Sequence, residues 1–389
     1  MIPQRVASID VFRAVTMFLM VFVNDLWSLQ DIPLWLEHSK ADVDFLGFSD
    51  VIFPCFLVIV GLSIPFALES RLQKSDPPLS IAWHILVRSV ALIVMGVFTV
   101  NLPDLSEERT GLSRPWYQIL MVIGFFLVWN AWPKQLSRKL TRSLEIGGIV
   151  LLLVLLFLFR AGTDNEPVPF RAQWWGILGL IGWSYGTVAL LYLLFRGNVW
   201  LLALAWLLFC LFPVAGHAGW LTALRPGGPK DWILGNGAFH AFVMTGVMTT
   251  LVWRRQPRSF VWLTIAAGVA FLAAGIFCRQ YFIISKIWAT PTWVFLCCGI
   301  ALLVYALLYV LVEERGKEQW FNLIRPAGTY SLTCYLIPYV LYAGAELSGL
   351  SLPEVLVTGF AGLLKSLLFS LLVVWMTSVL VRRGIRLKL

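Results

Sequence analysis

Charged side chains are scarce in this chain. Of its 389 residues, Asp, Glu, Lys and Arg make up 13%, which is about half of the share in soluble globular domains. Apolar residues make up 59%, and the mean hydropathy is +0.81. A soluble protein of this composition could not cover its surface with polar groups. The composition therefore argues against a soluble cytosolic enzyme and against a nucleic-acid partner, and it indicates that a lipid bilayer surrounds most of the chain.

The patterns of a metal site or a disulfide framework are also missing. The six cysteines lie in or beside apolar runs, without a CxxC pair and without a histidine at ligand spacing. We therefore expect neither a bound metal nor disulfide bonds. A cleavable signal peptide is not expected either, because Asp10 and Arg13 interrupt the first apolar run and no small-residue cleavage site follows it.

Long apolar runs separated by polar, proline or glycine breaks predict the fold. A transmembrane helix takes about 20 residues, and neither an internal repeat nor a linker divides the chain. We expect an all-α, polytopic integral membrane protein of about 11–12 transmembrane helices that forms one domain over residues 1–389. The expected helices lie at residues 9–27, 48–69, 81–101, 116–132, 144–159, 174–195, 198–214, 236–253, 259–277, 291–312, 326–344 and 354–380.

The distribution of basic residues predicts the orientation of these helices. Lys and Arg number 18 in the connections on one side and 9 in those on the other. Because cytoplasmic loops carry the surplus of Lys and Arg, both termini are expected in the cytoplasm. Arg13, Arg88 and Lys365 fall inside helices instead, and Lys365 is expected to pair with another buried residue.

Three polar residues lie along the first helix. Asp10, Arg13 and Asn24 fall within about 60° of one another on a helical wheel, so they form a stripe about 21 Å long. An ionisable residue inside a membrane is costly and indicates function. The alternative is structural: an Asp10–Arg13 pair and a hydrogen bond from Asn24 would then hold helices together.

A histidine and several carboxylates share the loop expected on the outer side, between the first two helices. His38 precedes Asp50, which opens the second helix. A neighbouring carboxylate fixes the tautomer of an imidazole and makes it a better general base, so we expect Asp50 to orient His38. The alternative is a solvated surface histidine. Among the other histidines, His240 lies near the outer end of the eighth helix and has a weaker claim to chemistry.

Motifs along nearly the whole chain resemble one family. The motifs are Arg5-Val-Ala-Ser8-Ile-Asp10-Val-Phe12-Arg13, Val23-Asn24, His38, Asp50-Val-Ile-Phe53-Pro54-Cys-Phe56 with Gly61 and Ser63, Ser285-Lys286-Ile-Trp288-Ala-Thr290-Pro291-Thr292-Trp293 and Pro326-Ala-Gly328-Thr329-Tyr-Ser331-Leu-Thr333-Cys-Tyr335. In order and spacing they are similar to the heparan-alpha-glucosaminide N-acetyltransferase family of transmembrane acyltransferases, in a bacterial branch.

The resemblance implies transfer of an acetyl group from cytosolic acetyl-CoA to an amino sugar or glycan across a bacterial inner membrane. His38 matches the family's catalytic histidine, Asn24 its active-site asparagine and Asp50 the acidic residue that opens the second helix. Two features depart from the family's pattern. The interval from His38 to Asp50 is longer than in the animal enzymes, and Ile119 stands where the family's Gln-Arg pair is expected to place its arginine.

The basic residues suit the donor end of this chemistry. Acetyl-CoA carries phosphates at one end and a thioester at the other, and arginines hold phosphates by charge-assisted hydrogen bonds. Arg13 and Arg88, with Arg71 or Lys74, are the candidates for this role. For Arg88, a buried ion pair with Asp10 or another acid is the alternative.

Other residues suit the acyl-transfer end. Asn24 can donate a hydrogen bond to the oxyanion that develops on the thioester. Lys286, Trp288 and Thr290 begin the tenth helix on the expected outer side and are predicted to line the acceptor pocket. Asp10 and His240 complete the predicted set of substrate-binding residues.

Three alternatives differ in their chemistry. An acetyl-histidine intermediate could replace general-base catalysis by His38. An O-acyltransferase acting on cell-wall or capsule polysaccharide would differ in its acceptor. A secondary transporter for sugars or organic anions would use Asp10, Arg13 and Arg88 as a midplane site. The expected partners are the lipid bilayer, a sugar or glycan acceptor and, as one option, a second copy of the chain.

Overall fold

The computed structural model describes residues 6–133, 135–163, 166–221 and 235–389, so Arg5 of the first motif lies outside the described residues. Nearly all regular structure is helical, and two short strands pair antiparallel. The elements are α1 (Ala7–Asp25), α2 (Ser49–Gln73), α3 (Pro78–Asn101), α4 (Glu107–Thr110), α5 (Arg114–Trp129), α6 (Arg138–Leu158), β1 (Arg160–Thr163), β2 (Glu166–Pro169), α7 (Ile177–Leu194), α8 (Val199–His217), α9 (Ala238–Arg255), α10 (Phe260–Cys278), α11 (Pro291–Tyr309), α12 (Arg325–Thr329), α13 (Ser331–Leu347) and α14 (Gly359–Arg382).

The expected all-α polytopic fold is confirmed. Each expected apolar run coincides with a helix, and within the described part of the chain nine helical segments are long and apolar enough to cross a membrane. α5 and α13 have only 16 and 17 residues, and α9 carries Arg254 and Arg255 in its last turn. The run expected at 326–344 is divided, because Tyr330 leaves helical geometry between α12 and α13.

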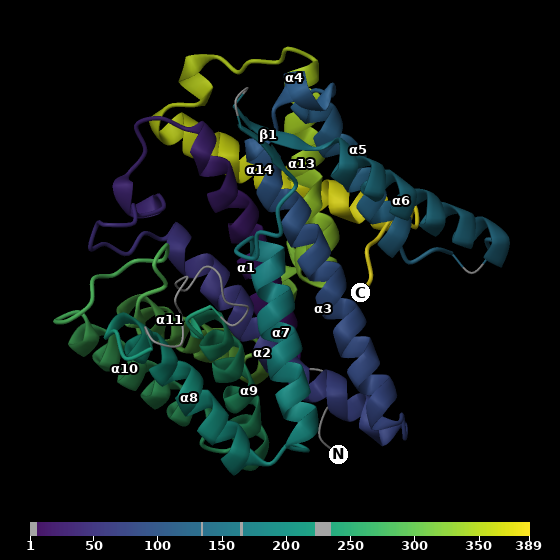
Figure 1. The fold of residues 1–389 in the computed structure, drawn as a ribbon. Helices are drawn as coiled ribbons and strands as arrows, with labels where there is room; N and C mark the ends of the chain where they lie inside the picture. Colours follow the sequence, from purple (N-terminus) through teal and green to yellow (C-terminus); the bar gives the residue numbers. More distant parts are fainter. Residues whose placement is uncertain (1–5, 134, 164–165, 222–234) are drawn as a thin grey trace.

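The helices form two groups around a central set (Figure 1). α8, α9, α10 and α11 lie together on one side, and α5, α6, α13 and α14 lie on the other, with α1, α2, α3 and α7 between them. α2 packs on α9 and α11, α3 packs on α7, and α1 packs on α2, α12 and α14. The central helices carry half of the twelve site residues predicted from the sequence: Asp10, Arg13, Asn24, Asp50, Arg71 and Arg88.

Small residues bring two helix pairs into close contact. A Cβ atom on Gly61 of α2 would lie 1.8 Å from the backbone oxygen of Val243 on α9. One on Gly96 of α3 would lie 2.2 Å from the backbone nitrogen of Gly179 on α7. Small residues let membrane helices approach this closely. These contacts fix the positions of α2 and α3.

The two ends of α1 define two sides of the molecule. The outer side is the one at the C-terminal end of α1, and the inner side is the one at its N-terminal end. Loops 26–48 and 279–290 lie on the outer side, and the segment after α14 lies on the inner side. The Lys and Arg distribution predicts that the inner side faces the cytoplasm.

Candidate active site

His38 and Asp50 are in contact at the outer end of α2. Nδ1 of His38 lies 2.8 Å from Oδ1 of Asp50. The other carboxylate oxygen accepts hydrogen bonds from the backbone N–H groups of Ser39 and Gly47, and the first turn of a helix favours a carboxylate. The side chain of Asp50 is 2% exposed, whereas that of His38 is 47% exposed. Asp50 is therefore fixed within the fold, and His38 is open to the outer side.

Lys286 is the third member of this group. Its Nζ lies 3.1 Å from Nδ1 of His38 and 3.7 Å from Oδ1 of Asp50. Burial lowers the pKa of Lys286, and the Asp50 carboxylate opposes that shift. Lys286 was expected to line the acceptor pocket, and in the structure it lies against the imidazole itself. His38, Asp50 and Lys286 are called the outer cluster below.

The distances indicate which ring nitrogen of His38 carries the proton and which keeps its lone pair. We assign the proton on Nδ1 to a hydrogen bond with Asp50, because that contact is the shorter one and its acceptor is charged. Lys286 then interacts with Asp50 as an ion pair. Nε2 keeps its lone pair under this assignment. It is the atom that can take a proton from a molecule on the outer side.

Contacts between two outer loops hold the outer cluster together. Asp44 in loop 26–48 accepts hydrogen bonds from the backbone N–H of Ile284 at 2.8 Å and from Nε of Arg279 at 2.9 Å. Burial alone would raise the pKa of Asp44, but these two hydrogen bonds lower it below its usual value. Nε1 of Trp288 also donates to Asp42 across the same pair of loops, at 3.3 Å.

Trp288 and Thr290 occupy different environments in loop 279–290 and the start of α11. Trp288 is exposed. Thr290 is buried and accepts a hydrogen bond from the backbone N–H of Ser285 at 3.0 Å. Between them, Ala289 has a positive φ of 48°, and Asn236 donates to its carbonyl oxygen at 2.6 Å. Thr290 thus shapes the loop, and Trp288 is the more exposed side chain of the two.

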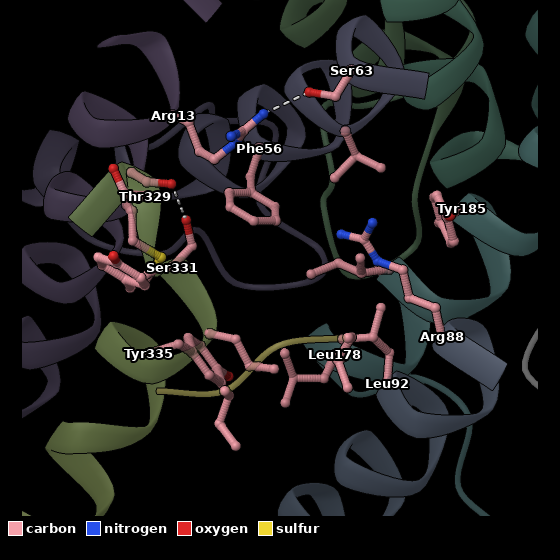
Figure 2. A pocket seen from close by; sticks show the side chains of 18 of the residues that line it. Arg13, Phe56, Ser63, Arg88, Leu92, Leu178, Tyr185, Thr329, Ser331 and Tyr335 are labelled. Carbon is pink, nitrogen blue, oxygen red and sulfur yellow. Dashed lines mark hydrogen bonds between the residues drawn. The ribbon is translucent and has the colours of Figure 1, made fainter. Parts of the chain in front are cut away.

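A cavity of about 370 Å³ lies between α1, α2, α3, α7 and α13 (Figure 2). Most of its wall is apolar, and its basic side chains come from α1, α3 and the segment after α14. It is called the inner cavity below. Its lining residues are Arg13, Met17, Met20, Phe56, Val60, Ser63, Ile64, Ala67, Arg88, Leu92, Ile177, Leu178, Ile181, Tyr185, Gly328, Thr329, Tyr330, Ser331, Leu332, Tyr335, Leu387, Lys388 and Leu389.

Two expected donor-binding residues meet in the inner cavity. Figure 2 shows the guanidinium groups of Arg13 and Arg88 entering from opposite walls. Arg13 donates to Ser63 at 2.6 Å and pairs with Asp10 at 3.3 Å. Arg88 lies over the ring of Tyr185, 4.8 Å from its centroid, and has no ion pair with any described carboxylate. The alternative role for Arg88 was a buried ion pair with Asp10 or another acid. No such pair is present among the described residues.

Lys388 lines the inner cavity, although it was not among the site residues predicted from the sequence. After α14 the chain returns to the inner ends of α5 and α13. There the backbone N–H of Lys388 donates to the carbonyl of Trp129, and that of Leu387 donates to Thr333 Oγ1. These bonds place residues 387–389 in the wall of the inner cavity. The sequence offered only a cluster of basic residues after the last apolar run, which loop charge alone explains.

The inner cavity points toward the outer cluster. Arg13, Met17 and Met20 line it, and Asn24 continues the same face of α1 one turn further out. On α2, Phe56 lies six residues from Asp50, which is about 9 Å of helix rise. Asn24 is partly exposed and makes no hydrogen bond with the described residues. Asn24 therefore lies one turn of α1 closer to the outer side than the cavity wall at Met20.

Three other expected site residues lie apart from both places. Arg71 is at the inner end of α2, where it pairs with Asp76 at 3.6 Å, and Lys74 is exposed beside it. His240 is buried on α9, where its ring stacks on Phe209 with centroids 5.0 Å apart. Within the described ranges, no group of three His, Cys, Asp or Glu side chains is arranged to hold a metal ion.

A second buried carboxylate, Asp25, was not expected. Its Oδ2 atom lies 2.7 Å from Nζ of Lys365 and accepts a hydrogen bond from Ser366 at 2.6 Å. Its Oδ1 atom accepts a hydrogen bond from Tyr342 at 2.6 Å, and Lys365 also donates to Ser28. Asp25 is thus the buried partner expected for Lys365, and it ties the outer end of α1 to α13 and α14.

The fold and these sites define an all-helical, multi-pass membrane protein with a basic cavity toward one side and a His–Asp pair on the other. The family model of DUF5009, a domain of unknown function, matches residues 5–232. Because this match covers more than half of the chain, the chain belongs to the DUF5009 family.

Two curated relatives carry a functional name. Human heparan-alpha-glucosaminide N-acetyltransferase is 34% identical over 104 residues, which is 26% of this chain and 14% of the human protein. The mouse protein of the same name is 35% identical over 191 residues, which is 43% of this chain and 27% of the mouse protein. The chain thus matches less than a third of the length of either relative. These matches confirm the family resemblance expected from the motifs, and the bacterial branch stays a prediction.

Proposed function

We propose that the chain is a transmembrane acetyltransferase, which moves an acetyl group from cytosolic acetyl-CoA to an amino sugar or related glycan on the outer side. The observation that carries the proposal is the contact between exposed His38 and buried Asp50, since a general base held by a carboxylate has this arrangement. The names of the curated relatives support acetyl transfer as the chemistry.

The inner cavity is the proposed donor site. Its cations, Arg13, Arg88 and Lys388, suit the phosphates of acetyl-CoA, and its apolar wall suits the thin arm that carries the thioester. The cavity reaches Phe56, about 9 Å of helix rise from Asp50. Lys388 can supply a phosphate contact in place of the arginine that Ile119 replaces.

The proposed reaction takes place between Asn24 and His38. The acceptor amine attacks the thioester carbonyl while Nε2 of His38 takes its proton, and Asn24 donates a hydrogen bond to the oxyanion. The C–N bond forms and the C–S bond breaks. CoA leaves as a thiolate and receives the proton from His38. Asp50 holds the imidazole in one tautomer and balances the charge of the imidazolium.

The proposal is tested with purified protein, acetyl-CoA and a panel of amino sugars and simple glycans. His38→Ala is expected to lower product formation by about 10²–10⁴-fold. His217→Ala serves as the matched control, because His217 is also a histidine of the outer side, and its Nε2 lies 3.0 Å from the backbone oxygen of Trp288. Product mass distinguishes acetyl from a longer acyl chain, and mild alkaline hydrolysis, which cleaves esters but leaves amides intact, distinguishes O- from N-acetylation.

A second variant tests the donor half of the proposal. Arg88→Gln is expected to raise KM for acetyl-CoA about tenfold with kcat nearly unchanged, because a charged hydrogen bond to the donor is lost away from the reacting atoms. Wild-type turnover by folded His38→Ala would refute the general base. If the wild type forms no product and CoA does not stabilise it, the donor assignment fails, and sugar counterflow in liposomes then tests the transporter alternative.

A further inference from the structure

A second cavity, of about 210 Å³, lies at the inner ends of α2, α7, α8 and α9. Three arginines line it: Arg196 between α7 and α8, and Arg254 and Arg255 at the end of α9. Glu69 and Tyr192 complete its polar wall. No residue lines both this cavity and the inner cavity. It is called the arginine pocket below.

The charges of the arginine pocket do not balance. Glu69 accepts a hydrogen bond from the hydroxyl of Tyr192 at 2.6 Å and forms an ion pair with Arg254. The negative charge of Glu69 thus balances the positive charge of Arg254. Arg196 and Arg255 form no ion pair with any carboxylate in the described ranges. The pocket therefore holds two uncompensated positive charges, and it suits an anion with several acceptor oxygens.

The surroundings of the pocket indicate where such an anion comes from. Arg196 lies two residues after Leu194 and four before Trp200, and both of these apolar side chains are exposed. Exposed Leu and Trp at helix ends are typical of side chains in contact with lipid at the membrane interface. The pocket is thus at the level of the headgroups of the inner leaflet, with apolar contacts for acyl chains beside it.

We propose that the arginine pocket binds the headgroup phosphate of an anionic phospholipid from the inner leaflet. Basic pockets between transmembrane helices on the cytoplasmic side recognise lipid phosphates in this way. Arg196 and Arg255 hold the phosphate, and Arg254 stays with Glu69. The bound lipid bridges α7 and α9, which the Tyr192–Glu69–Arg254 contacts already connect through α2. This proposal is independent of the acetyltransferase activity.

The test measures thermal unfolding of the purified full chain during titration with phosphatidylglycerol, phosphatidylcholine, inorganic phosphate or CoA. The test variant is the double substitution Arg196→Gln/Arg255→Gln. The matched control is Arg258→Gln/Arg315→Gln, which removes the same charge from two exposed arginines outside the pocket. Unfolding temperatures without lipid show whether each variant folds. Phosphatidylglycerol is expected to stabilise the wild type more than phosphatidylcholine does.

Lipid and CoA binding by the test and control variants decide whether the arginine pocket binds a lipid phosphate. The apparent Kd for phosphatidylglycerol is expected to rise at least about tenfold in the test variant, and by less than about twofold in the control, with CoA binding unchanged in both. Equal losses in both variants would overturn the proposal, because they would reflect diffuse surface charge. Inorganic phosphate binding as tightly as phosphatidylglycerol would overturn the lipid as the source. Loss of CoA binding in the test variant would assign the pocket to the donor instead.

Discussion

Asp25 and Asp50 are two buried carboxylates on the outer side of the same bundle, and they have different surroundings. Each side chain is 2% exposed, and each has a lysine as an ionic partner. The partners of Asp25 belong to packed helices: Lys365 is 17% exposed, and Ser366 and Tyr342 each donate a hydrogen bond to the carboxylate. The partners of Asp50 lie in loops, and one of them is the half-exposed His38.

The surroundings of a buried carboxylate distinguish a structural role from the catalytic role proposed for Asp50. The hydrogen bonds of Asp25 end within the protein, so its charge holds three helices together. The hydrogen bond of Asp50 joins it to His38, a side chain that is half-exposed on the outer side. Burial of the carboxylate is the same in both places. What differs is the exposure of the group that each carboxylate contacts, which is 47% for His38 and 17% for Lys365.

The largest effect is expected for Asp50→Asn. The asparagine no longer fixes the tautomer of His38 or balances an imidazolium, so kcat should fall by about 10²–10⁴-fold. Backbone N–H groups of Ser39 and Gly47 can still donate to the amide oxygen, so the protein should remain folded. Steady-state kinetics and thermal unfolding of the same preparation check both expectations. An Asp50→Asn protein with wild-type kcat would remove the contrast with Asp25.

Asp25→Asn is expected to act on stability. Removing one partner of a buried ion pair leaves the other charge uncompensated and costs about 3–5 kcal/mol. The free energy of unfolding in mixed detergent measures this. Asp25→Asn combined with Lys365→Met should recover part of the loss, because the pair is then removed together. A loss below about 1 kcal/mol in the single variant would show that Asp25 is not the structural member of the comparison.

The two lysines sharpen the same comparison. Lys365→Met should cost more stability than Lys286→Met, because Lys365 is less exposed and its loss leaves Asp25 without a cation. The difference is expected to be about 1–3 kcal/mol. Asp50 keeps His38 and two backbone donors after Lys286→Met. Equal unfolding free energies for the two variants would contradict this account.

A third carboxylate, Asp44, extends the comparison to an exposed site and predicts the smallest effect. Its pKa is lowered from 3.8 in the folded protein, so it contributes stability above that pH and the contribution is lost as the pH falls through the lowered pKa. Because the Asp44–Arg279 pair is exposed, the contribution should be at most about 1 kcal/mol. Unfolding free energies at neutral pH and near pH 3 should differ less in Asp44→Asn than in the wild type.

The fold was largely predictable because one physical signal dominates it. Apolar runs long enough to cross a membrane mark each long helix, but they mark the ends less well. α6 begins at Arg138, six residues before its apolar run, because Ser137 caps it and its charged first turns are helical too. The hairpin of β1 and β2 was missed, since four-residue strands between helices leave almost no periodicity in the sequence.

The site was predictable where its residues are close in sequence or share a helix face. The His38–Asp50 contact follows from a carboxylate at the start of α2 and a histidine in the loop before it. The contact of Lys286 with His38, 248 residues apart, depends on how two outer loops pack. Asp25 and Lys388 were missed for the same reason, since their roles arise from α14 and from the chain that follows it.

The most direct test of the proposed function is the sidedness of the reaction. The protein is reconstituted in vesicles with its inner side facing the lumen, acetyl-CoA is trapped inside, and an amino sugar that cannot cross the membrane is added outside. The account predicts acetylated sugar outside only when acetyl-CoA is inside, and none with His38→Ala. Product that forms only when donor and sugar share one side, or that persists in His38→Ala, would contradict it.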